Sequence, residues 1–122
     1  MDYREMREEV TRVLDSLPKQ FRSRLHNVVV VIEKRPGKNH LRAMGLDPRQ
    51  GVLYGLYEGT PLSERSSFNP PVLPDKITIF YEPLTRDFPD PAELRKQIRL
   101  TVLHEIAHFF GIDEDEIEKL GY

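Results

Sequence analysis

The chain has 122 residues, of which 39% are hydrophobic and 31% charged, with a formal net charge of -2. Such a chain is expected to form one domain over residues 1–122, and its charge argues against electrostatically driven nucleic-acid binding. No run reaches the ~20 apolar residues of a membrane span, and the N-terminus lacks an apolar signal core, so we expect a cytoplasmic protein. Because the sequence contains no cysteine, a metal site must use nitrogen and oxygen ligands.

The first half of the sequence predicts a helix followed by two strands. Residues 3–17 carry apolar side chains at helical spacing, and Pro18 ends this pattern. Residues 27–34 form a β-branched run that is apolar enough for a central strand. Residues 52–59 predict a second strand, in which Gly55 suggests a bulge or a close approach to the strand backbone.

A basic stretch covers residues 19–42, where seven Lys and Arg residues stand against one acid, Glu33. We interpret these charges mainly as solvated surface. Contact with nucleic acid is the weaker alternative, and steeply salt-dependent binding would support it.

The second half predicts a long loop, a strand and a well-marked helix. Residues 60–75 contain four prolines and no periodicity, and loops of this length are often functional. Residues 76–84 alternate between apolar and polar positions, which predicts a strand. Asp90 and Pro91 suit the N-cap and first turn of a helix, and Asp113 suits the N-cap of a last short helix. The order of elements predicts an α+β fold with a small, mostly antiparallel sheet.

The long C-terminal helix carries His104, Glu105 and His108 in the spacing H-E-x-x-H. At ~100° per residue, His108 lies about 40° and Glu105 about 100° from His104, and most of the remaining circumference is apolar. A narrow polar arc on a buried helix needs partners, water or a metal. Two histidines four residues apart can bind Zn²⁺, and the adjacent Glu105 can be the general base for a zinc-bound water. The alternative is a pair of surface histidines with no metal, which the apolar surroundings disfavour.

Three separated segments resemble a family of short bacterial zincin-like domains described as minimal zinc metallopeptidases. They are GLYEGTPLSERS at 55–66, LPDKITIFYEPL at 73–84 and TVLHEIAHFFGIDEDEIEKLGY at 101–122. The resemblance implies a minimal zincin-like fold, in which the active helix packs beneath a small sheet and an edge strand flanks the cleft. It also implies His104 and His108 as zinc ligands and Glu105 as catalytic base.

The third zinc ligand is less well defined by the sequence. In larger zincins the motif continues through a glycine to a further ligand, and the matching positions here are Gly111 and Glu114. A Glu carboxylate can bind zinc at ~2.0–2.2 Å. The acids of this segment also suit a helix start, with Asp113 as N-cap and Glu114 and Asp115 in the first turn. Asp113, Asp115 and water therefore stay open as alternatives to Glu114.

The leading functional hypothesis is a zinc-dependent metallopeptidase that cleaves a peptide or protein substrate. An edge strand, either 52–59 or 76–82, can align the peptide by β-augmentation. Tyr57, Tyr81 and His40 are candidates for stabilising the oxyanion. The alternative is a catalytically inactive zincin-fold module that binds a protein or peptide partner. Only eleven residues follow Gly111, too few to build a further wall of a substrate pocket, which favours this alternative. A 60–75 loop lying over the histidines would indicate it.

Overall fold

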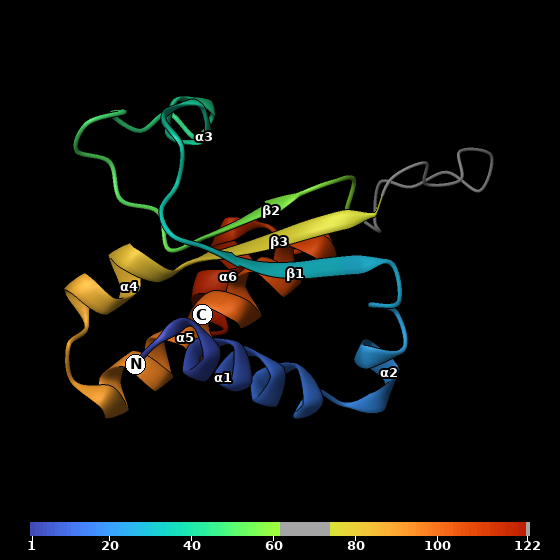
Figure 1. Ribbon diagram of the computed structural model, residues 1–122. Coiled ribbons are helices and arrows are strands. Elements are labelled where there is room, and N and C mark those ends of the chain that lie inside the picture. The colour runs from blue at the N-terminus through green and yellow to red at the C-terminus, as the bar shows by residue number, and fades with distance from the viewer. Residues whose placement is uncertain (62–73, 122) are drawn as a thin grey trace.

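Helices pack beneath a small sheet in the computed structural model, which describes residues 1–61 and 74–121 (Figure 1). The expected loop at 60–75 therefore falls mostly outside the described residues, and so does the hypothesis that it covers the histidines. The α+β class is confirmed. The elements are α1 (Tyr3–Asp15), α2 (Lys19–Arg22), β1 (Val28–Glu33), α3 (Lys38–Ala43), β2 (Gly55–Glu58), β3 (Asp75–Phe80), α4 (Tyr81–Asp87), α5 (Pro91–Phe109) and α6 (Glu114–Lys119).

The sheet is mixed rather than mostly antiparallel, with the strand order β1-β3-β2. β1 runs parallel to β3, and β2 runs antiparallel to it. The prediction of 27–34 as the central strand is wrong, because β3 takes the middle position. Alternate β3 side chains are buried on both faces, with Ile77 and Phe80 both at 0% exposure, whereas Val29 of β1 is 43% exposed.

The main core lies between the sheet, α1 and α5. The carboxylate of Asp2 caps α1 by accepting from the Glu5 N–H at 2.8 Å, and one apolar face of the helix packs against α5. The short helix α3 lies on the other side of the sheet (Figure 1). It buries Leu41, and the His40 ring lies near that of Phe80, with the centroids 6.5 Å apart. The buried side chains of the main cluster are Met6, Val10, Val13, Ile77, Ile79, Leu84, Leu94, Ile98, Val102 and Ile106.

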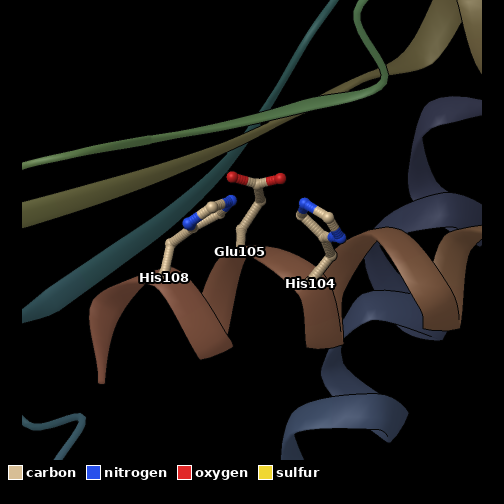
Figure 2. A group of neighbouring side chains, drawn as sticks. All are labelled: His104, Glu105 and His108. Carbon is tan, nitrogen blue, oxygen red and sulfur yellow. The ribbon is translucent and has the colours of Figure 1, made fainter. Parts of the chain in front are cut away.

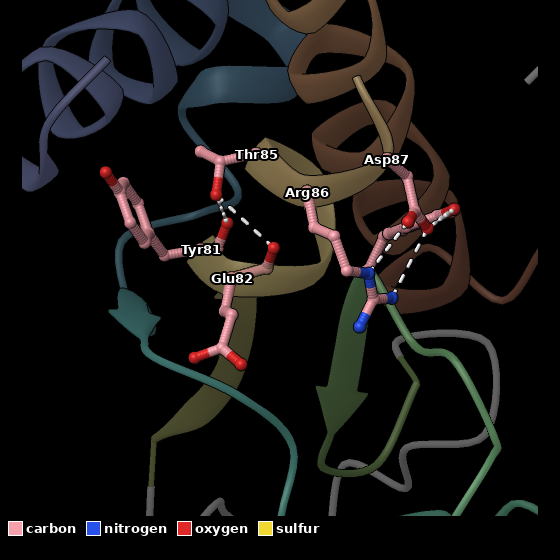
Figure 3. A network of polar contacts seen from close by, with 6 residues as sticks. Tyr81, Glu82, Thr85, Arg86 and Asp87 are labelled. Atoms are coloured by element: carbon pink, nitrogen blue, oxygen red, sulfur yellow. Dashed lines mark hydrogen bonds and ion pairs between the residues drawn. The ribbon is translucent and has the colours of Figure 1, made fainter. Parts of the chain in front are cut away.

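The strand predicted over 76–84 ends at Phe80, and α4 begins at the next residue. Pro83 has no N–H for a strand ladder but fits the first turn of a helix, which explains the early change. The Thr85 hydroxyl donates to the Tyr81 carbonyl at 2.9 Å, a hydrogen bond within α4 (Figure 3). α4 then leads the chain under the sheet into α5.

Both ends of α5 have defined caps. The Asp90 carboxylate accepts from the Glu93 N–H at 3.0 Å, as the sequence predicts for the helix start. At the other end, Gly111 has a φ of 83° and its N–H donates to the His108 carbonyl, while the Ile112 N–H donates to Ala107. These two bonds form a Schellman turn, which a glycine at positive φ favours.

The turn after α5 brings α6 back beside the histidine-bearing end of that helix. Asp113 caps α6 by accepting from the Glu116 N–H at 2.9 Å. Ile117, which is 0% exposed, anchors the short helix in the core. Within the described ranges, no helix has the length and apolarity needed to cross a bilayer.

Candidate metal centre

α5 directs His104, Glu105 and His108 toward the sheet (Figure 2). The Glu105 carboxylate lies between the two imidazoles, whose ring centroids are 4.9 Å apart. One nitrogen or oxygen atom from each residue lies within 4.8 Å of the others. These three side chains form a group that could hold a metal ion.

Glu114 reaches the same place from the first turn of α6. Its Oε1 atom lies 3.2 Å from Nε2 of His104 and 2.8 Å from Nε2 of His108. The neighbouring Asp113 is engaged as the α6 N-cap. Of the acids left open by the sequence, Glu114 is thus the one that the structure brings into contact with both histidines.

The donor set fits zinc in both chemistry and spacing. Imidazole nitrogens and a carboxylate oxygen are ordinary zinc ligands. Ligand atoms ~2.0–2.1 Å from a tetrahedral zinc lie about 3.3 Å from one another. The Glu114 oxygen is 3.2 and 2.8 Å from the two Nε2 atoms, so shifts of about half an ångström would give this spacing.

Glu105 is the buried member of the group, with 8% of its surface exposed. Burial raises the pKa of its carboxyl from 4.5 to about 7; the charge of His104 opposes this shift, and that of Glu114 adds to it. The backbone N–H of Tyr57 donates to the carboxylate and also lowers this pKa. A carboxyl with a pKa near neutrality can both accept and return a proton, as a general base must.

Gly55 sets the distance between β2 and α5. A Cβ atom at this position would lie 2.7 Å from Cγ2 of Thr101 and 3.2 Å from Cγ of Glu105. Side chains of α5 therefore come close to the strand backbone at Gly55, the close approach that the sequence suggests as one of two possibilities. It keeps the edge strand near enough for the Tyr57 N–H to reach the Glu105 carboxylate.

A hollow of about 410 Å³ opens beside the group. Val52, Leu53 and Tyr54 line it from the strand side, and Leu100 lines it from α5, next to His104 and Glu105. Much of this lining is apolar, so the hollow suits an apolar side chain.

One wall of the hollow depends on a contact that the sequence did not reveal. The Tyr54 hydroxyl donates to Asp87 of α4 at 2.6 Å, and Asp87 also accepts from Arg86 at 2.9 Å, a pair drawn in Figure 3. Burial and the Asp87 carboxylate raise the pKa of Tyr54 to about 12, which keeps its hydroxyl a donor. The partners are 33 positions apart, and no local pattern links them.

The three residues considered for oxyanion stabilisation are engaged elsewhere. The Tyr81 hydroxyl donates to the Met1 carbonyl, and that of Tyr57 donates to Asp75 at 2.8 Å. The His40 imidazole lies 3.9 Å from the Glu58 carboxylate. Since β3 is paired on both sides, residues 76–82 provide no free edge, and β2 is left as the strand for peptide alignment.

A helix bearing H-E-x-x-H beneath the edge strand of a small sheet is the arrangement of zincin metallopeptidases. The family model described as zincin-like metallopeptidase matches residues 25–122, and the chain belongs to this family. Among curated proteins, none matches the sequence.

Proposed function

We propose that the protein is a zinc-dependent peptidase, with zinc bound by His104, His108 and Glu114 and with Glu105 as the general base. The convergence of Glu114 Oε1 on both histidine Nε2 atoms carries this proposal, because it joins α6 to the H-E-x-x-H helix at one point. Three protein ligands leave one coordination position of the zinc open for substrate or water, as in other catalytic zinc sites.

Zinc, when bound, would supply a Lewis acid that polarises the scissile carbonyl and acidifies water. Glu105 accepts a proton from the attacking water, whose oxygen bonds to the carbonyl carbon. The carbon–nitrogen bond then breaks, and Glu105 returns the proton to the leaving amine.

The edge of β2 provides a way to align the substrate. The Phe80 N–H donates to the Tyr54 carbonyl at 2.8 Å, so Tyr54 directs its backbone toward β3. The N–H and C=O groups of successive residues point to opposite sides of a strand, so those of Gly55 and Tyr57 point away from β3. The Tyr57 N–H donates to Glu105, which leaves the Gly55 groups and the Tyr57 carbonyl for a substrate strand. An extended peptide placed along this edge would have its carbonyl near Glu105 and an apolar side chain in the hollow beside Leu100.

Metal analysis combined with peptide cleavage tests the proposal. Wild type should bind one zinc, and His104→Ala and Glu114→Ala should each weaken binding at least tenfold. Glu105→Gln should keep zinc and lose hydrolysis of a quenched-fluorescence peptide library. If His104→Ala leaves the zinc content unchanged, the metal site is refuted. If the Glu114→Ala variant binds zinc as tightly as wild type, Glu114 is refuted as the third ligand. A zinc-loaded wild type that cleaves no peptide would indicate a non-catalytic binding module.

A further inference from the structure

A second hollow, of about 320 Å³, collects positive charge from three parts of the chain. Arg35 and Lys38 line it from the segment after β1, Arg49 from the segment before β2, and Arg86 from α4. These segments meet at one end of the sheet beside α4 (Figure 1). We call this hollow the basic pocket.

The charges of the basic pocket are only partly compensated. Arg86 pairs with Asp87 at 2.9 Å, and Arg35 lies 4.0 Å from Glu82, the acid that also lines the hollow. Among the residues that the structure describes, Lys38 and Arg49 have no acidic side chain within ion-pair distance. The pocket thus keeps about two net positive charges on a chain whose formal net charge is -2. A concave surface lined by one sign of charge attracts a ligand of the opposite sign.

The basic pocket lies next to the hollow at the metal centre, because Val52 lines both. The segment from Gly51, which lines the basic pocket, to Gly55 beside Glu105 spans four residue steps. At ~3.3 Å per extended residue, these steps cover at most about 13 Å. A peptide that occupies the apolar hollow can therefore reach the basic pocket with about three to five further residues.

We propose that the basic pocket recognises an acidic side chain of the peptide substrate, about three to five residues from the side chain that fills the apolar hollow. The inference rests on the proposed peptidase function and names its substrate class: peptides with an apolar residue near the scissile bond and a Glu or Asp at a fixed distance from it. A carboxylate is the ligand expected for Lys38 and Arg49, which line the same hollow, and the Arg side chains offer paired N–H donors.

Binding of peptides to zinc-loaded Glu105→Gln tests the proposal without cleavage. The probes are end-capped neutral peptides with one central Leu, in which a single Glu is moved one position at a time, with Gln as the matched control. Fluorescence anisotropy should show a preference for Glu of about five- to tenfold at low salt, confined to a narrow range of positions and weakened at high salt.

The double substitution Lys38→Glu and Arg49→Glu should abolish this preference and leave binding of the Gln peptide unchanged. Arg7→Glu with Arg24→Glu, which changes the same charge on α1 and next to α2, is the control and should retain the preference. Equal binding of Glu and Gln peptides at every position would overturn the proposal. So would a preference that survives the double substitution, or a single-stranded oligonucleotide that displaces the Glu peptide by binding the same cations more tightly.

Peptide cleavage is measured separately, with the wild-type protein, which retains Glu105. Cleavage without any preference for Glu would contradict the basic pocket and support the peptidase. Position-specific binding of the Glu peptide with no cleavage would contradict the peptidase and support acidic-peptide recognition.

Discussion

Replacing Glu105 by Gln removes a buried charge and keeps both the shape of the side chain and an acceptor for the Tyr57 N–H. In metal-free protein, the pKa of Glu105 lies near 7 instead of its ordinary 4.5. At ~1.36 kcal/mol per pKa unit, ionising Glu105 above neutral pH costs the folded state about 3 kcal/mol. Since domains of this kind are stable by ~5–15 kcal/mol, this effect should be easy to measure.

The sign follows from linkage. Glu105 has a raised pKa in the folded state, so its stabilising contribution is complete below about pH 4.5 and is lost as the pH rises through about 7. Glu105→Gln has no such group. The free energy of unfolding of the variant should match wild type at low pH and exceed it by about 3 kcal/mol near pH 8.

Urea unfolding in the presence of a chelator, repeated from about pH 4.5 to about pH 8, measures this difference. Glu118→Gln, an exposed position on α6, is the matched control and should show no pH-dependent difference from wild type. A constant difference between Glu105→Gln and wild type across the pH range would refute the assignment of a buried, destabilised carboxylate.

Three further substitutions probe the parts that hold the site. Gly55→Ala should cost about 1–3 kcal/mol in denaturant unfolding, because the new methyl group would overlap Thr101, and an unchanged midpoint would contradict this contact. Gly111→Ala should cost about 1 kcal/mol, since φ is 83° there, and should also reduce zinc affinity in a competition assay; unchanged affinity would show that the turn does not position α6. Tyr54→Phe should lose about 1 kcal/mol because Asp87 loses a donor, and a Tyr54 titration midpoint near the ordinary value of 10 in wild type would contradict the hydrogen bond.

Features that depend on nearby residues could be predicted from the sequence. The period of the helix places His104, Glu105 and His108 on one side, and the caps at Asp90 and Asp113 follow from residue type and spacing. The close approach at Gly55 was likewise suggested by a glycine inside a strand pattern. Each of these signals lies within a few residues of the feature that it predicts.

Features that depend on strand pairing could not be predicted in the same way. The β-branched run 27–34 looks like a central strand, but it lies at an edge because β3 inserts between β1 and β2. Which strand pairs with which is decided by contacts far apart in the sequence, and the apolar run alone does not encode it. The basic pocket has the same origin, because Lys38, Arg49 and Arg86 come from three separate segments that only the folded structure brings to one hollow.

The short length of α6 has a consequence for how fast a metal could leave the site. Glu114 stands in the first turn of a six-residue helix, and helices this short have little stability of their own. The buried Ile117 and the Schellman turn at Gly111 hold α6 in place. If Glu114 binds zinc as proposed, transient fraying of α6 would withdraw one ligand while both histidines stay on the rigid α5. Metal exchange would then follow the opening rate of α6 rather than the unfolding of the protein, and Ile117→Ala would speed zinc release to a chelator.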